Sequence, residues 1–332
     1  MGRPRLDTFQ KLAVATTATT YLLILVGGLV RAVGAGLGCP DWPKCFGSWV
    51  PPLRADELPA GFDPLLFNAP LTWTEYVNRL LGVVVGVLIL ATLAAAILRH
   101  RRTRRVLWPT GAAFLLVGFQ GWLGGRVVAH GLEPGIVTAH LVVALIIVSL
   151  LLYATVNAFF PHAAHAPGPE RRLIGRGGKA LIALTLVQVA VGTQVRSRID
   201  DAAATGQTRR EELIGSVGAT DTVHRSTALL VLAGALALYT AVRRRPRGPI
   251  WLRGAGAAVV ALILAQISAG VILVTLGLPR GVQVAHLTLA SLLLGAETLV
   301  ALLAYRLPED SPPGAAPASP AGRLEPAVLE SK

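Results

Sequence analysis

The residues most able to do chemistry are three histidines and one asparagine that stand inside apolar stretches: His140, His224, His286 and Asn78. We expect each to lie one to two turns into a helix that begins on the outer side of a membrane. The four positions then share one depth, and each half of the chain presents two of them across a helical bundle. His224 and His286 together offer two axial imidazoles, which is a natural ligand set for haem iron.

Other interpretations of these histidines exist. A zinc ion would need three or four close nitrogen or sulfur ligands, and the sequence places none within reach. An ordinary buried histidine bonded to a neighbouring backbone is the remaining alternative at each position. Ionisable residues inside a membrane are costly and usually functional, which favours the cofactor. Small residues nearby leave room for a flat macrocycle, namely Gly124, Gly135, Gly270 and Gly281.

The other four histidines are weaker candidates. His100, His162 and His165 fall in or beside predicted cytoplasmic loops, where we expect them to be solvated. His130 lies in a short outward turn and has no counterpart in the second half of the chain.

An acidic residue stands three residues before two of the candidate positions. These acids are Glu75 and Asp221, and each points along the same helix face as the residue it precedes. An acid in a first helical turn often serves only as a cap or as a partner of the helix dipole. Arg79 and Arg225 follow, and they could pair with these acids or with the carboxylates of a bound haem.

The elements that position these residues are membrane helices. The chain has 332 residues, 53% of them apolar and only 15% charged, with a mean hydropathy of +0.59. Soluble domains carry nearer a quarter charged residues, so the soluble class is excluded. The net charge of +13 does not indicate nucleic-acid binding, because the basic residues form short clusters between long uncharged stretches.

Eight stretches are long enough to cross a bilayer, at about 20 residues each. They span 12–33, 73–98, 107–129, 136–158, 179–197, 220–242, 250–275 and 282–305. Basic clusters at 99–105, 171–179 and 243–247 place those loops and both termini in the cytoplasm by the positive-inside rule. We therefore expect a cytoplasmic N-terminus at 1–11, outward loops at 34–71 and 198–219, a cytoplasmic linker at 159–178 and a disordered tail at 306–332.

Both cysteines of the chain, Cys39 and Cys45, lie in the first outward loop. Two cysteines exclude a four-thiolate iron–sulfur cluster and a cysteine-rich zinc site. An oxidising outer compartment permits a disulfide between them, which we favour over free thiols or metal binding.

The chain repeats itself at a shift of 146 residues. Residues 120–141 and 266–287 agree at nine of 22 positions, and the least accidental identities are Gln120/Gln266, Gly131/Gly277 and His140/His286. The same shift pairs Glu75 with Asp221 and Asn78 with His224. The sequence thus predicts an all-α membrane protein of two tandem four-helix bundles, 12–158 and 179–305, related by internal duplication.

Four motifs resemble those of the haem A synthase family. The segment Gly36-Leu-Gly-Cys39-Pro-Asp-Trp-Pro-Lys-Cys45 resembles its outward-loop signature, and Glu75-Tyr-Val-Asn78-Arg79 resembles its second-helix motif. Ala139-His140-Leu and Ala285-His286-Leu resemble its fourth- and eighth-helix motifs. The resemblance covers roughly residues 10–305. Asn78 departs from the pattern, which often has histidine there, as an actinobacterial-like variant would.

The resemblance implies an oxidoreductase of the plasma membrane. It would oxidise the C8 methyl group of haem O to a formyl group by successive hydroxylations, making haem A for cytochrome oxidase. His224 and His286 would ligate the iron of a haem b cofactor, and His140 with Asn78 would hold haem O, His140 as an iron ligand. Glu75 would be the catalytic acid.

The same resemblance implies a disulfide between Cys39 and Cys45, and it names neighbours. Haem O synthase and cytochrome oxidase assembly components would be partners within the lipid bilayer, with no nucleic acid. Two other functions also fit a pair of haem-ligating histidines, namely a di-haem electron-transfer cytochrome and a non-catalytic haem carrier or assembly factor.

Overall fold

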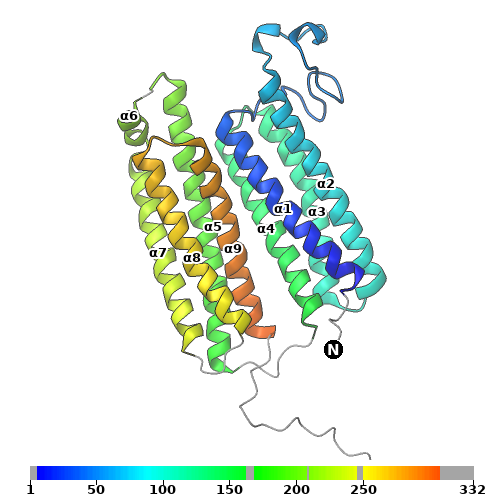
Figure 1. Ribbon diagram of the computed structural model, residues 1–332, viewed down its shortest axis with the longest axis vertical. Coiled ribbons are helices and arrows are strands. Elements are labelled where there is room, and N and C mark those ends of the chain that lie inside the picture. The colour runs from blue at the N-terminus through cyan, green and yellow to red at the C-terminus, as the bar shows by residue number, and fades with distance from the viewer. Residues whose placement is uncertain (1–5, 162–167, 208, 245–249, 307–332) are drawn as a thin grey trace, which may run out of the picture.

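The computed structural model describes residues 6–161, 168–207, 209–244 and 250–306. Within these residues the chain is helical and forms no strand (Figure 1). The first bundle contains α1 (Thr8–Val33), α2 (Ala69–His100), α3 (Arg104–Ala129) and α4 (Pro134–Phe159). The second contains α5 (Pro169–Ala204), α7 (Ala219–Arg243), α8 (Ile250–Thr275) and α9 (Arg280–Arg306). Short helices lie in the connections, namely η1 (Ala55–Glu57), η2 (Pro64–Leu66) and α6 (Arg210–Gly215).

Among the described residues, eight helices are long and apolar enough to cross a membrane, which confirms the predicted fold class. Their exposed surface is apolar, as a lipid-facing surface requires: Leu115 is 71% exposed, Val83 62% and Leu229 62%. The internal duplication stays a prediction.

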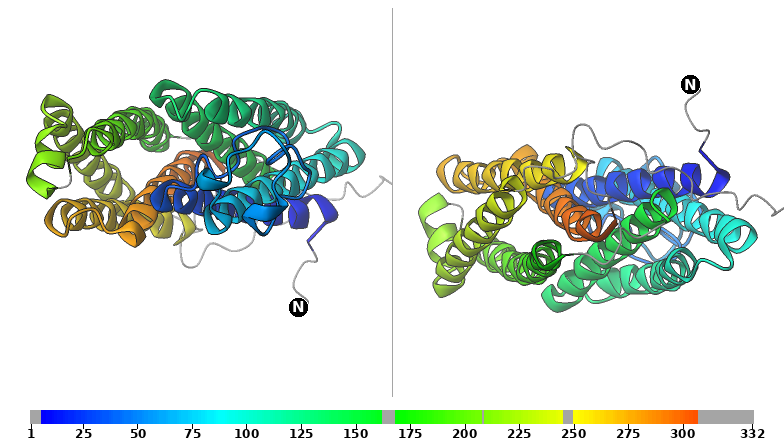
Figure 2. Two further views of the ribbon diagram at one scale, coloured as in Figure 1. Left: turned by 90° about the horizontal axis from the view of Figure 1, so that it is seen from above. Right: turned by 90° about the horizontal axis from the view of Figure 1, so that it is seen from below.

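Each bundle is a square of four helices (Figure 2). In the first bundle, α1 and α3 each pack against both α2 and α4, so α2 and α4 lie on one diagonal. In the second, α5 and α8 each pack against both α7 and α9, which lie on the corresponding diagonal. The halves meet where α9 packs against α1 and α4 and where α4 packs against α5.

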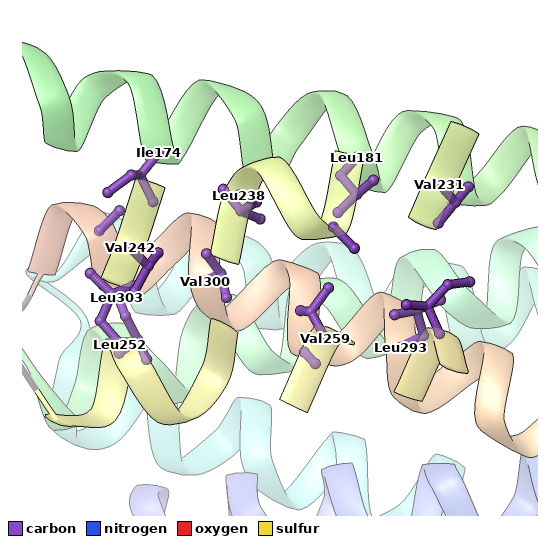
Figure 3. Packing of buried hydrophobic residues seen from close by; sticks show 14 of the residues in the cluster. Ile174, Leu181, Val231, Leu238, Val242, Leu252, Val259, Leu293, Val300 and Leu303 are labelled. Atoms are coloured by element: carbon purple, nitrogen blue, oxygen red, sulfur yellow. The ribbon is translucent and has the colours of Figure 1, made fainter. Parts of the chain in front are cut away.

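The interior of the second bundle is a continuous apolar cluster (Figure 3). Val231 of α7 and Leu293 of α9 lie close together at one level, and Val259 and Leu181 lie at the next. In lipid, burying these side chains removes no surface from water, so they stabilise the bundle through van der Waals packing rather than through the hydrophobic effect.

Helix ends follow local sequence signals. Asp7 and Gln10 form a capping box at the start of α1, with Gln10 N–H donating to Asp7 Oδ1 at 2.7 Å. The Glu133 carboxylate caps α4 by accepting from the Gly135 and Ile136 N–H groups at 3.0 and 2.9 Å. These bonds hold the pKa of Glu133 below its ordinary value, the larger contribution coming from Gly135.

Two equivalent turns connect α3 to α4 and α8 to α9. Each contains two successive residues with positive φ: Gly131 and Leu132 at 57° and 65°, and Gly277 and Leu278 at 71° and 61°. The Leu132 N–H donates to the Val127 carbonyl at 2.9 Å, and Leu278 makes the equivalent bond at 3.0 Å. Glycine at the first position tolerates this left-handed backbone, so the Gly-Leu pair of the repeat marks a helix stop.

Several helices extend beyond the predicted spans. Pro169 begins α5 ten residues before the predicted start at 179, so half of the proposed linker 159–178 is helical. Asn68 caps α2 through the Leu71 N–H at 3.1 Å and starts that helix at Ala69. Hydropathy detects the part of a helix that lies in lipid and misses polar turns beyond it. The predicted tail 306–332, apart from Arg306, lies outside the described residues.

Candidate functional site

The two histidines of the second half face each other across its diagonal. His224 on α7 and His286 on α9 have ring centres 6.5 Å apart, with ring planes at 58°. The Nδ1 atom of each ring is buried and has no hydrogen-bond partner among the described residues. Buried polar atoms nearly always have a partner, so these nitrogens point to a missing ligand.

This separation suits a metal ion ligated from both sides. A metal–imidazole bond is about 2 Å long and the ring centre lies about 1 Å beyond its nitrogen, so such a metal holds two ring centres roughly 6 Å apart. In the described part of the chain, no three His, Cys, Asp or Glu side chains gather closely enough to form a conventional metal site. Two protein ligands fit an iron whose other bonds come from a macrocycle.

Glycines line the other diagonal of the second bundle. A Cβ atom added to Gly192 on α5 would lie 3.0 Å from Cε1 of His224, and one added to Gly270 on α8 would lie 3.4 Å from Cε1 of His286. The Gln188 side-chain amide on α5 donates to the backbone carbonyl of His224 at 2.9 Å. The histidines therefore lie against bare backbone, which leaves space for a flat group.

The first half repeats this plan with one change. A Cβ atom on Gly124 would lie 3.4 Å from Cε1 of His140, and one on Gly27 would lie 3.8 Å from Oδ1 of Asn78. Asn78 Oδ1 and His140 Nδ1 are buried without partners among the described residues. The Gln120 side-chain amide donates to the His140 carbonyl at 2.7 Å. An amide thus occupies the position that an imidazole occupies in the second half.

The four positions are not equally deep along their helices. His140 and His286 lie six residues after the starts of α4 and α9, and His224 lies five after the start of α7. Asn78 lies nine residues into α2, about two and a half turns rather than the predicted one to two. The difference arises because the polar cap at Asn68 extends α2 above the apolar span.

Glu75 is buried beside the first-half position, 6% exposed, and pairs with Arg79 one turn later at 3.0 Å. The Arg79 guanidinium also donates to the backbone carbonyls of Asp41, Lys44 and Cys39 at 2.7, 2.9 and 3.3 Å. Arg79 therefore binds both the acid and the outward loop, whereas a contact of Arg79 or Arg225 with a haem carboxylate stays a prediction.

The second half contains the equivalent ion pair in a more open setting. Arg225 contacts Asp221 at 2.7 Å, with side chains 55% and 26% exposed, against 13% and 8% for Arg79 and Glu75. The two acids thus occupy matching places but different environments, and only Glu75 is shielded from solvent.

Cys39 and Cys45 form the expected disulfide, with Cα atoms 4.8 Å apart. The Asp41 carboxylate holds the loop between them by accepting from the backbone N–H groups of Phe46 and Gly47 at 2.6 and 2.9 Å. The Trp42 ring of this loop lies against Gly125, where an added Cβ atom would come within 2.9 Å. The loop is therefore fastened over the outer end of the first bundle.

The remaining described histidines have ordinary partners. His130 ends α3, is exposed, and its ring nitrogens contact Arg126 at 2.7 and 3.0 Å. His100 contacts Asp7 at 3.2 Å and packs edge-on against Phe9. His162 and His165 lie outside the described residues.

Sequence reasoning missed two polar features. Glu297 is completely buried in α9, and a lone acid inside an apolar span was the available signal. Between the halves, Asp200 pairs with both Arg31 and Arg196, the latter at 2.8 Å. Arg31 and Arg196 stand at equivalent positions near the ends of two matching spans, which was a weak sign of this cluster. Their common partner, Asp200, lay in a predicted loop, so the sequence did not pair it with them.

Comparisons with known proteins give one consistent result. The family model described as "Cytochrome oxidase assembly protein" matches residues 10–298. The chain is 29% identical to a protein named heme A synthase from Methylorubrum populi, over 90% of this chain and 89% of the relative. It is 29% identical to a heme A synthase of Methylorubrum extorquens over 99% and 97% of the two chains, and 31% identical to one of Alkalihalophilus pseudofirmus over 50% and 51%. The chain belongs to the cytochrome oxidase assembly protein family that this model describes.

Proposed function

We propose that this protein is a haem A synthase that oxidises the C8 methyl group of haem O to a formyl group. The observation that carries the proposal is the pair of His224 and His286, whose ring centres are 6.5 Å apart across one bundle, whereas the two matching positions of the other bundle hold one histidine, His140, and Asn78. One half is thus equipped for a permanently six-coordinate cofactor and the other for a substrate. The names of the relatives, and the family, support the same reaction.

In this proposal His224 and His286 hold haem b, and His140 holds the iron of haem O. Bound haem b would supply one-electron transfer. Asn78 is a poor iron ligand, so it leaves the face of haem O opposite His140 without a second strong ligand. The methyl carbon would undergo two successive two-electron oxidations, each replacing a C–H bond with a C–OH bond while electrons pass through the one-electron carrier haem b, and the resulting gem-diol would lose water to give the aldehyde.

Glu75 is the proposed catalytic acid. Its carboxyl group is buried on the helix that carries Asn78, one turn from it, and Arg79 holds it in place at 3.0 Å. There it can hold or pass a proton beside the reacting substituent, or stabilise positive charge that develops on the substrate. Asp221, which is less buried than Glu75, occupies the matching place in the second half, where no substrate is proposed.

The membrane placement is also proposed. The basic clusters put both termini on the cytoplasmic side of the plasma membrane and the disulfide-containing loop outside. Haem O synthase and cytochrome oxidase assembly components are the proposed neighbours. The four glycine–side-chain contacts and the two Gly-Leu turns support descent of the halves from one duplicated unit.

The test is to purify the protein, extract its haems in acid acetone and identify the porphyrins after supplying haem O. We expect haem B together with haem O, its hydroxylated derivative and haem A. Glu75→Gln should keep both haems but form no haem A, whereas the matched control Asp221→Asn should form it. Haem B alone, with haem O supplied, would instead indicate an electron-transfer cytochrome or a carrier, and full product from Glu75→Gln would remove Glu75 from the reaction.

A further inference from the structure

A buried carboxyl group in the second bundle has no part in the site described above. Glu297 on α9 is 0% exposed. Its Oε1 atom accepts a hydrogen bond from Thr185 Oγ1 on α5 at 2.8 Å, whereas its Oε2 atom is buried and has no partner in the part of the chain that the structure describes. A carboxyl group inside a membrane is costly, and half of the bonding capacity of this one is unused.

The architecture does not require an acid at this place. At the repeat shift of 146, Leu151 of α4 corresponds to Glu297, and this leucine is 1% exposed within the apolar core of the first bundle. A leucine therefore fills the position in one half. The acid occurs only in the half that contains two facing histidines.

Glu297 lies on the same face of α9 as His286. The two residues are eleven apart, which is close to three full turns and about 16 Å along the helix. On α5, Thr185 lies seven residues, or about 10 Å, from Gly192, the glycine that contacts His224. The carboxyl group is therefore in the same bundle interior as the histidine pair, displaced toward the end of the bundle with the basic loops.

Both apolar and polar groups lie between the carboxyl group and the histidines. Val231 and Leu293 form an apolar layer (Figure 3). Alongside it, Gln188 stands one turn from Thr185 on α5, donates to the His224 carbonyl at 2.9 Å and accepts from the Thr227 hydroxyl. The apolar layer keeps the dielectric low between the carboxyl group and the histidines, and Gln188 provides hydrogen-bonding groups along one side of that layer.

The charged surroundings of Glu297 are sparse. No Asp, Glu, Lys or Arg occurs within residues 180–195, 226–242 or 254–279, nor within 287–305 of α9 apart from Glu297 itself. The facing stretches of α1 and α4, residues 12–30 and 134–159, contain none either. Tyr21 of α1 is a titratable side chain close to this part of α9, because its hydroxyl lies against Gly295. A charge bound between the histidines would therefore act on Glu297 with little competition.

We propose that Glu297 takes up a proton when the haem iron held by His224 and His286 is reduced. A ferric porphyrin with two neutral imidazoles has one net positive charge at its core, and the ferrous form has none, so reduction raises the proton affinity of a nearby buried carboxylate. One electron goes to the iron and one proton goes from water to the carboxylate. This inference rests on the haem site proposed above, but not on the oxidation of haem O.

The test is a spectroelectrochemical titration of the full-length protein, loaded with haem b, in lipid nanodiscs at a series of pH values. The midpoint potential of the wild type should fall as pH rises. Glu297→Gln and Glu297→Leu, the latter copying Leu151, should both lose the part of this pH dependence that Glu297 contributes. Thr185→Val, which keeps the carboxyl group but removes its donor, should displace the slope to another pH range without abolishing it.

Infrared difference spectra between the oxidised and reduced forms give a second readout. A carboxylic-acid C=O band should appear on reduction in the wild type and be absent in Glu297→Gln. Haem propionates also titrate and contribute to both readouts. The decisive measurement is therefore the difference between wild type and Glu297→Gln in the slope of midpoint potential against pH and in the carboxylic-acid band. A wild-type slope in Glu297→Gln, with its low-spin spectrum intact, would overturn this inference alone, whereas failure to bind haem b in the wild type would overturn the proposed function as well.

Discussion

Substituting alanine for Gly192 gives a graded test of the second-half site. The added Cβ atom would lie 3.0 Å from His224 Cε1, whereas the same change at Gly270 would place it 3.4 Å from His286 Cε1. Carbon atoms in contact lie about 3.5–4.0 Å apart, so the His224 ring must move by at least about 0.5 Å, whereas 3.4 Å at His286 is already close to ordinary contact. The first change should therefore disturb the proposed bond from His224 to iron, and the second should leave the proposed bond from His286 intact.

Overpacking of this kind costs about 1–3 kcal/mol. Since about 1.4 kcal/mol is a factor of ten in affinity, Gly192→Ala should weaken haem b retention by roughly 5- to 150-fold. Gly270→Ala should stay within about twofold of the wild type. Alanine is the better helix former by about 1 kcal/mol, so neither variant should lose thermal stability in the haem-free state.

The assay is the rate of haem transfer to an excess of apomyoglobin, read together with the low-spin optical spectrum. Gly254→Ala on α8 is the matched control, because its added Cβ atom meets no atom within 4 Å. Equal haem loss from Gly192→Ala and Gly270→Ala, or wild-type retention in Gly192→Ala, would refute the assignment of His224 as a ligand held against Gly192.

Three further predictions concern the first half. Asn78→His should give a second six-coordinate low-spin spectrum when haem O is supplied, because it adds a second strong ligand opposite His140; unchanged spectra would contradict the proposed substrate position. Arg79→Lys should expose the outward loop to protease about tenfold faster, since an ammonium cannot span the Glu75 carboxylate and three carbonyls, and an unchanged cleavage rate would show that other contacts hold the loop. The depressed pKa of Glu133 means that its cap contributes stability above its unfolded pKa and loses it as pH falls through the folded value. The protection factors of the Gly135 and Ile136 amides, which correct for the intrinsic pH dependence of exchange, should therefore fall in acid in the wild type and be low at every pH in Glu133→Gln.

The sequence was sufficient for the features that depend on one-dimensional patterns. Apolar length located the eight spans, and the fixed shift of 146 residues paired His140 with His286 and Asn78 with His224. The spacing of Glu75 and Arg79 predicted their pairing as one alternative, since residues four apart share a helix face.

Other features depend on three-dimensional packing and could not be predicted in this way. That Gly192 contacts His224 depends on the crossing of α5 and α7, which no spacing within one helix reveals. The three loop carbonyls bound by Arg79 depend on the path of an irregular segment. Glu297 was visible in the sequence, but its partner Thr185 lies 112 residues away, so only the fold shows that the acid is buried and half-satisfied.

The position of α9 has a consequence for biosynthesis. Among the described helices, 61% of its apolar window is buried, against 39% or less for each other membrane-length helix, because it packs on α1 and α4 as well as on α5 and α8. It is also the last of them to leave the ribosome. Insertion of α9 therefore supplies His286 and Glu297 and closes the seam between the bundles in a single step. The proposed haem b could be held from both sides only after that step, and a ribosome that stalls before residue 280 would leave the seam uncovered.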